Sequence, residues 1–230
     1  MKDFSKIEKI IGVEFKNKDY LTQAFVHRSY INENPNFNLP HNERLEYLGD
    51  AVLELIVSEY LYKNYPNPEG DLTNWRASLV NAKMLAEVAQ KLEFDHYLFL
   101  SKGEAKDKNS KARNTILANT FEAVAGAIYL DHGFVKCKNF VKSVLLVKLD
   151  EIIKNHLYLD PKSKLQEIAQ DKLNITPSYK VLDEWGPDHN RHFKIGAYFN
   201  KDLVAEGVGS SKQEAQVEAA KNALKKKDWE

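Results

Sequence analysis

The spacing of apolar residues predicts that the first two thirds of the chain are helical. Apolar side chains recur at positions 4, 7, 10 and 11 and stop before Gly12, a pattern typical of a short helix and its end. Stretches with few apolar residues, at 32–40 and 102–111, are expected to be loops. The same periodicity predicts further helices over 19–26, 41–65, 71–93 (in one or two pieces), 115–130 and 134–149. Residues 1–155 are therefore interpreted as one all-α domain.

The pattern changes after Asn155, and residues 156–160 are expected to form a linker. A short helix over 163–173 precedes three segments in which apolar and polar residues alternate, as they do in half-buried strands. These segments are 178–184, 191–199 and 203–208, and an alanine-rich helix over 211–227 closes the chain. Residues 161–230 are thus predicted to form a second, α+β domain with the order α-β-β-β-α.

Composition narrows the class of protein only a little. Lys plus Arg and Asp plus Glu number 33 each, so any surface that binds nucleic acid must be a local one. Cys137 is the only cysteine, which excludes a disulfide framework or a thiolate metal cage within one chain. The N-terminus lacks an apolar signal core, and the longest apolar stretch, 123–130, is too short to span a membrane. We expect a soluble cytoplasmic protein.

Three acidic residues share one face of the helix predicted over 41–65. Glu43, Glu46 and Asp50 are spaced i, i+3 and i+7, so their carboxylates project from the same side, at the edge of the apolar stripe. Like charges at this spacing destabilise a helix unless something neutralises them. Gly49 lies between them and would allow another group to approach the backbone closely.

A second helix offers two more oxygen ligands. Asn119 and Glu122 are spaced i, i+3 on an otherwise almost wholly apolar segment, where an unpaired carboxylate would be costly. Oxygen ligands from two helices could hold a hard divalent cation, Mg²⁺ above all, which activates water in phosphodiester hydrolysis. The alternative is that these acids are neutralised by Arg44, Arg76 or Arg113, and spacing alone does not decide between the two interpretations.

The segment Asn42–Val52, NERLEYLGDAV, resembles the signature of the ribonuclease III family nearly letter for letter. The resemblance extends over essentially the whole chain, through His27-Arg28-Ser29, Glu69–Leu72, Arg76–Val80, Ile116–Ala123 and the second domain. It implies a bacterial-type endonuclease of double-stranded RNA that acts in RNA processing. Such enzymes are homodimers whose two active sites each cut one strand, leaving 5′-phosphate and 3′-hydroxyl ends with a short 3′ overhang. They use no small-molecule cofactor.

The resemblance also assigns roles to single residues of the nuclease domain. It implies metal-binding carboxylates at Glu46, Asp50 and Glu122, with Asp50 and Glu122 closest to the chemistry, and Mg²⁺ as the metal with Mn²⁺ as a substitute. Asn119 stands where many members carry Asp, so one ligand keeps its oxygen but loses its charge. Further positions are accessory acids at Glu43 and Glu69, a dimer contact at Tyr47, and a structural role for His27-Arg28-Ser29.

The second domain resembles double-stranded-RNA-binding domains, which read the shape of A-form RNA across two minor grooves and the phosphates between them. Three elements are expected to contact RNA: the first helix, the turn between the first two strands, and the start of the last helix. The residues concerned are Lys164, Gln166, Glu167, His189, Asn190, Ser211 and Lys212. The competing hypothesis is an RNA-binding protein of the same fold that does not cleave, and the uncharged Asn119 is its only support.

Overall fold

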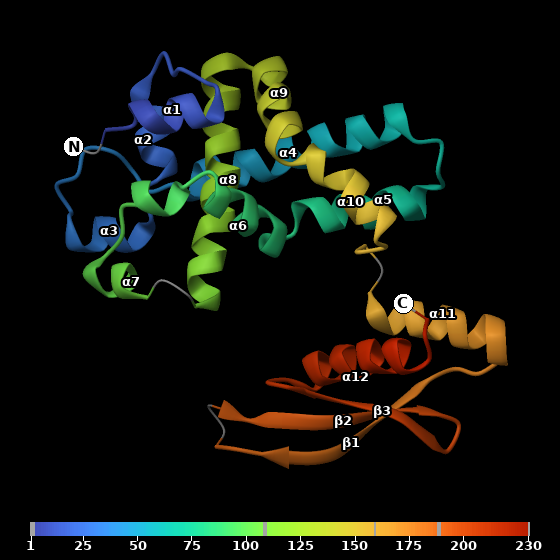
Figure 1. Ribbon diagram of the computed structural model, residues 1–230. Coiled ribbons are helices and arrows are strands. Elements are labelled where there is room, and N and C mark those ends of the chain that lie inside the picture. Colours follow the sequence, from blue (N-terminus) through green and yellow to red (C-terminus); the bar gives the residue numbers. More distant parts are fainter. Residues whose placement is uncertain (1–2, 108–109, 159, 188–189, 230) are drawn as a thin grey trace. The chain divides into compact units, whose positions relative to one another are not determined.

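The computed structural model describes residues 3–107, 110–158, 160–187 and 190–229, and the chain divides into two compact units, Met1–Tyr158 and Leu159–Glu230. The first unit is helical and the second combines helices with a sheet, so the predicted fold class is confirmed (Figure 1). The linker predicted over 156–160 spans the boundary between the units. Tyr158 belongs to the first, where its ring lies edge-on to Trp75 with centroids 6.0 Å apart.

The first unit is built around two long helices that cross each other. These are α4 (Glu43–Asn64) and α8 (Lys111–His132), and α8 is buried along most of its length because its sequence is apolar on nearly all sides. The surrounding elements are α1 (Ser5–Ile11), α2 (Lys18–Ala24), α3 (Arg28–Glu33), α5 (Glu69–Val80), α6 (Ala82–Lys91), η1 (Phe94–Tyr97), α7 (Lys102–Lys106), α9 (Phe134–Val144), η2 (Leu146–Lys148) and α10 (Leu149–Lys154).

The start of α4 is fixed by a buried asparagine. Asn42 is 3% exposed, its backbone N–H donates to the carbonyl of Val26 at 2.9 Å, and its side-chain amide donates to the carbonyl of Ala24 at 3.1 Å. A buried polar group is tolerated when it is hydrogen-bonded, and here the bonds join α4 to the end of α2. The first turn of α4, which carries the acidic residues, is thereby anchored to the core.

Two expectations for the first unit were wrong in detail. Residues 102–106 form the short helix α7, not a loop, because Ser101 caps it by accepting from the backbone N–H of Glu104 at 3.2 Å. The helix predicted over 134–149 ends at Val144 and continues, after the 3₁₀ turn η2, as α10. Periodicity alone did not reveal either feature, since both depend on local hydrogen bonds.

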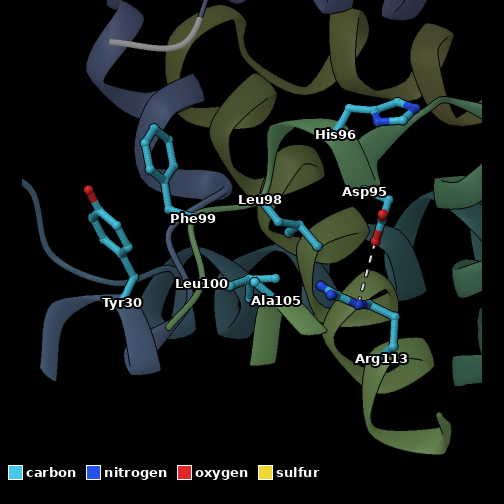
Figure 2. A pocket seen from close by; sticks show the side chains of 8 residues that line it. All are labelled: Tyr30, Asp95, His96, Leu98, Phe99, Leu100, Ala105 and Arg113. Atoms are coloured by element: carbon cyan, nitrogen blue, oxygen red, sulfur yellow. Dashed lines mark ion pairs between the residues drawn. The ribbon is translucent and has the colours of Figure 1, made fainter. Parts of the chain in front are cut away.

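Arg113, at the start of α8, joins the α7 segment to the core. It is 3% exposed, and its guanidinium donates to the carbonyls of Asp107 at 3.1 Å and Glu104 at 2.9 Å. Its Nε also lies 3.5 Å from a carboxylate oxygen of Asp95. Asp95 and Arg113, with Tyr30 and Phe99, are among the residues that line a cavity of about 490 Å³. Figure 2 draws these side chains and marks the ion pair between Asp95 and Arg113. Arg113 is thus a buried structural cation.

The second unit packs two helices on one face of an antiparallel sheet with the strand order β1-β2-β3. Alanines of α12 allow the helix to lie close to the sheet, and a β-carbon at Gly207 would lie 2.1 Å from the backbone nitrogen of Ala219. The predicted order α-β-β-β-α is confirmed. The elements are α11 (Pro161–Leu173), β1 (Ser178–Trp185), β2 (His192–Phe199), β3 (Asp202–Gly209) and α12 (Lys212–Lys226). None of the helices that the structure describes is long and apolar enough to cross a membrane.

Candidate nuclease site and RNA-binding surface

Two glycines let α4 and α8 touch backbone to backbone. A β-carbon at Gly49 of α4 would lie 1.8 Å from the carbonyl oxygen of Glu122, and one at Gly126 of α8 would lie 2.3 Å from the carbonyl oxygen of Leu45. No other residue type fits at either position without moving a helix. The close approach that Gly49 predicted is therefore confirmed, and the group that approaches it is the backbone of Glu122.

This crossing brings the acidic residues of both helices into one electrostatic cluster. Burial and the charges of Asp50 and Glu46, in that order, raise the pKa of Glu122 to about 8. Burial and the charge of Glu43 also raise the pKa of Glu46, while a hydrogen bond with Asn119 opposes that shift. Burial contributes most to both raised pKa values and the neighbouring carboxylates add to it, so each acid is held less readily in its charged form. The cluster of Glu46, Asp50, Asn119 and Glu122 is hereafter the acidic cluster.

The alternative interpretation, that arginines neutralise these acids, finds no support in the described contacts. Arg76 pairs with Glu54 at 2.9 Å, and Arg113 contacts Asp95 and two backbone carbonyls. No ion pair between Arg44 and the acidic cluster is present among the described residues. The charge of the cluster is therefore available to a cation that is not part of the chain.

The donors of the acidic cluster suit a hard divalent cation. All four offer oxygen, which Mg²⁺ and Mn²⁺ prefer, and Mg²⁺ commonly keeps several waters and needs only one or two carboxylates. Among the residues that the structure describes, no group of three or more acidic, histidine or cysteine side chains is placed to hold a metal ion, so the carboxylates of the acidic cluster do not by themselves form a complete site. The raised pKa of Glu122 nevertheless indicates that binding a cation would relieve repulsion within the cluster.

The two acids predicted to assist differ in their surroundings. Glu43 lies close enough to raise the pKa of Glu46, and its carboxylate is 3.5 Å from Arg28 and 3.8 Å from His41. Glu69 is exposed at the start of α5, where it accepts a hydrogen bond from Thr73 at 3.0 Å. No described contact joins Glu69 to the acidic cluster, so its role remains a prediction.

Three residues of this site had no assigned part in the chemistry at the level of sequence. Gly126 completes the helix crossing, Asn42 anchors the start of α4, and Arg28 pairs with Glu43. Gly126 could have been noticed as the partner of Gly49, since a lone glycine in a helix often marks close packing. The position of Arg28 depends on the turn before α3, which periodicity does not describe.

The predicted RNA-contacting residues of the second unit lie at the ends of helices and in a turn. On α11, Gln166 and Glu167 are exposed and Lys164 is half-buried. Ser211 caps α12 by accepting from the backbone N–H of Glu214 at 3.1 Å, and the Lys212 ammonium lies 5.5 Å from the centre of the Phe193 ring. The first turn of α12 thus places a lysine at the N-terminal end of a helix, which suits a phosphate.

The turn between β1 and β2 is closed by a tight backbone contact. Gly186 has a φ of 92°, and a β-carbon there would lie 2.3 Å from the carbonyl oxygen of Asn190, so the position requires glycine. Asn190 is exposed, and its N–H donates to the carbonyl of Pro187 at 2.8 Å. His189, predicted to contact RNA, lies outside the described residues.

Comparisons with known proteins agree with this architecture. A family model described as ribonuclease-III-like matches residues 17–149, and one described as a double-stranded RNA binding motif matches residues 161–227. Proteins named ribonuclease 3 are 42% identical in Enterococcus faecalis (96% of each chain) and in Nitratiruptor sp. (98% of this chain, 97% of the relative). The nuclease domain of ribonuclease III from Campylobacter jejuni is 37% identical with a TM-score of 0.54, covering 65% of this chain and 96% of that one.

The two units and the acidic cluster together define a nuclease that carries its own double-stranded-RNA-binding domain. The matches over nearly the whole length place this chain in the ribonuclease III family. It is an endoribonuclease of double-stranded RNA, and its family consists of metal-dependent nucleases. Neither the fold nor the comparisons favour the competing hypothesis of a protein that binds RNA without cleaving it.

Proposed function

We propose that the protein hydrolyses double-stranded RNA with Mg²⁺ held by the acidic cluster, Mn²⁺ being able to replace it. The observation that carries this assignment is the α4–α8 crossing, where Gly49 meets the backbone of Glu122 and the acidic residues of the two helices lie close together. Burial, and after it the charges of Asp50 and Glu46, raise the pKa of Glu122 at this place. Asp50 and Glu122 are assigned to the chemistry itself, and Glu46 and Asn119 to holding the metal. Glu43 and Glu69 are assigned accessory roles at the rim.

In this mechanism the chain supplies position and charge. The acidic cluster would hold Mg²⁺, which would supply a Lewis acid that lowers the pKa of water and stabilises the developing charge on phosphate. Asp50 is exposed and can reach the substrate side, while the backbone of Glu122 is held in place by the α4–α8 crossing. The Asn119 amide donates to Glu46 and fixes the orientation of that carboxylate. The products are 5′-phosphate and 3′-hydroxyl ends.

Asn119 in place of aspartate lowers the negative charge of the site by one. Its amide oxygen still ligates hard cations, while its N–H₂ group, which aspartate lacks, donates to Glu46. We therefore propose that the enzyme is active but needs more metal than a variant with aspartate here. An Asn119→Asp variant should reach half-maximal rate at a lower Mg²⁺ concentration, with a smaller difference in Mn²⁺.

We propose that the enzyme acts as a homodimer through the outer face of α4. Three large apolar side chains of this helix are exposed: Tyr47 at 83%, Leu55 at 58% and Tyr62 at 81%. Their spacing places them within one face of the helix, and exposed apolar surface of this kind is typical of an interface. Tyr47, the residue next to Glu46, would then insert into the partner subunit. A Tyr47→Asp variant should shift sedimentation towards the monomer.

The second domain is proposed to hold the duplex. Lys164, Gln166 and Glu167 on α11 would face one minor groove, and His189 and Asn190 in the β1–β2 turn another. Ser211 and Lys212 at the start of α12 would contact the phosphates between them, where the N-terminal end of the helix favours an anion. Processing of ribosomal, messenger or regulatory duplexes in the cytoplasm is the proposed cellular role, since such duplexes are the substrate class.

The decisive experiment is cleavage of a long RNA duplex by the full-length protein with no metal, with Mg²⁺ and with Mn²⁺. We expect cutting with either metal, none with EDTA, and product ends that a 5′-phosphate-dependent exonuclease can attack. Single-stranded RNA of the same sequence is the control. If wild type is inert with both metals while Asn119→Asp cuts, the natural chain has lost its chemistry at this position, and the proposal is wrong.

A further inference from the structure

The turn before α3 presents one cation to the rim of the acidic cluster. His27 caps α3, with its Nδ1 accepting from the backbone N–H of Ser29 at 3.3 Å and facing the Ser29 hydroxyl at 2.8 Å. Burial lowers the pKa of His27, which keeps the ring neutral so that Nδ1 can accept. His27 and Ser29 are therefore bonded to each other, as the structural role predicted for them requires.

The same turn is tied to a distant segment. The backbone N–H of His27 donates to the carbonyl of Phe99 at 3.1 Å, and the Ser29 hydroxyl accepts from the N–H of Ser101 at 3.1 Å. These bonds fix the backbone on both sides of Arg28. The side chain of Arg28, between them, takes no part in this network and is 68% exposed. Its direction is set by something other than packing.

The partner of the Arg28 side chain is Glu43, which lies one turn before Glu46 on α4. Arg28 Nη1 lies 3.5 Å from Glu43 Oε1, and in the described part of the chain the guanidinium makes no hydrogen bond, so its donors remain available to a ligand. Among the described residues, Arg28 is also the only lysine or arginine that pairs with any acid of this face of α4 up to Asp50. A planar guanidinium with free donors matches phosphate oxygens in a two-pronged geometry.

We propose that Arg28 binds a backbone phosphate of the RNA duplex beside the acidic cluster, and that Glu43 is its positioning residue. The inference rests on the proposed function in one respect, that the duplex lies across the acidic cluster. It gives Glu43 a second purpose, because Oε1 faces Arg28 while Oε2 lies 3.8 Å from His41 Nδ1. A carboxylate placed in this way orients the arginine, whose positive charge partly offsets the repulsion between RNA and the acids.

The test compares full-length Arg28→Gln, Arg28→Lys, Glu43→Gln and the Arg28→Gln/Glu43→Gln double variant. Lys142→Gln, which removes one charge from an exposed position of α9, is the matched control. Steady-state cleavage of a short duplex is measured at several salt concentrations. We expect Arg28→Gln to raise KM about tenfold with kcat nearly unchanged, and to reduce the salt slope of kcat/KM by about one, as loss of one phosphate contact does.

The remaining variants test whether Glu43 acts through Arg28. Arg28→Lys should show a smaller rise in KM than Arg28→Gln, because lysine keeps the positive charge but lacks the two-pronged guanidinium. Glu43→Gln should raise KM less, and should have little further effect on KM once Arg28 is absent, because its positioning role acts through that residue; a change in kcat would report its accessory role at the acidic cluster. A salt slope or KM of Arg28→Gln equal to that of wild type and Lys142→Gln would overturn the proposal. So would a loss confined to kcat.

Two measurements without catalysis separate this inference from the proposed function. Binding of the duplex to each variant in EDTA should show the same loss of salt slope, even if no metal supports cutting. Calorimetric titration of each variant with Mn²⁺ in the absence of RNA should give an affinity within about twofold of wild type for Arg28→Gln. A large fall in Mn²⁺ affinity would instead show that Arg28 serves the metal site, and the phosphate assignment would be wrong.

Discussion

Gly49 of α4 lies so close to the carbonyl oxygen of Glu122 of α8 that a β-carbon at position 49 would stand 1.8 Å from it. The residue that allows the helices to meet and the residue with the most perturbed carboxyl group are therefore in direct contact. The contact is between backbones, so no change of side-chain rotamer can relieve a clash there. Packing of the two longest helices and assembly of the acidic cluster thus depend on the same few atoms.

Replacing Gly49 with alanine should destabilise the nuclease domain by about 3 kcal/mol or more, because one helix must move to admit the methyl group. Urea unfolding followed by circular dichroism measures the effect. Gly70→Ala is the matched control, since a β-carbon at that helical position has nothing within 4 Å. Equal stability of Gly49→Ala and wild type would show that the helices do not touch as described.

Much of this arrangement was predictable from sequence. The periodicity over 41–65 and 115–130 located both central helices, and the spacing of Glu46 and Asp50 predicted that they share one face of the first of them. Their common role with Glu122 was implied by the family resemblance and stays a prediction. These signals are local, because residues three or four apart on a helix share a face. The α-β-β-β-α order was predictable for the same reason.

The rest depends on contacts between residues far apart in sequence. Nothing in the spacing of Gly49 indicates that Glu122 is its neighbour, and the tie between Ser29 and Ser101 crosses 72 positions. The helix α7 was missed because it has no large apolar residue, and its order comes from the Ser101 cap and from Arg113. The sequence pattern shows which face of a helix or strand is apolar, while tertiary hydrogen bonds decide which faces pack together.

A Glu122→Gln variant should lose cleavage by about 10³-fold or more while keeping its affinity for duplex RNA. The amide keeps the shape of the side chain but removes the charge that would hold a metal ion, and the second domain remains intact. Single-turnover cleavage and gel-shift binding of one duplex, in parallel, measure the two properties. Loss of both together would contradict the division of labour between the domains.

The metal-free protein should become less stable as pH rises towards 8. Glu122 has a pKa of about 8 in the folded protein and near 4.5 when unfolded, so the folded state holds more protons between these values. Its contribution to stability is fully present below about pH 4.5 and is lost as pH rises through 8. We expect a loss on the order of 1–3 kcal/mol across this window.

Comparison with Glu122→Gln isolates that contribution from other titrating groups. Thermal unfolding in EDTA at pH 6 and pH 9 should show a smaller decrease for the glutamine variant than for wild type. Metal binding should show the converse dependence, because a cation competes with the proton on Glu122 and its apparent affinity should rise up to about pH 8. A wild-type stability with the same pH dependence as the variant would contradict the raised pKa.

Arg113→Met should destabilise the nuclease domain by about 2–4 kcal/mol, since it leaves two backbone carbonyls and the Asp95 carboxylate without their buried cation. Arg76→Met removes a half-exposed arginine paired with Glu54 and should cost at most about 1 kcal/mol. Urea unfolding measures both variants, and limited proteolysis shows whether residues 102–107 become accessible. Similar stability of the two variants would contradict the role of Arg113 as the buried residue that joins the α7 segment to the core.

Truncation after Tyr158 should separate catalysis from duplex anchoring. The first unit has its own core, to which Tyr158 contributes through Trp75, so the fragment should fold. Without the second unit the enzyme loses most of its phosphate contacts, and each contact adds to the salt dependence of binding. Cleavage by the fragment should be weak at physiological salt, recover in part at low salt, and show a smaller salt slope than the full chain. Equal activity of both forms across salt concentrations would place the main RNA-binding surface on the nuclease domain.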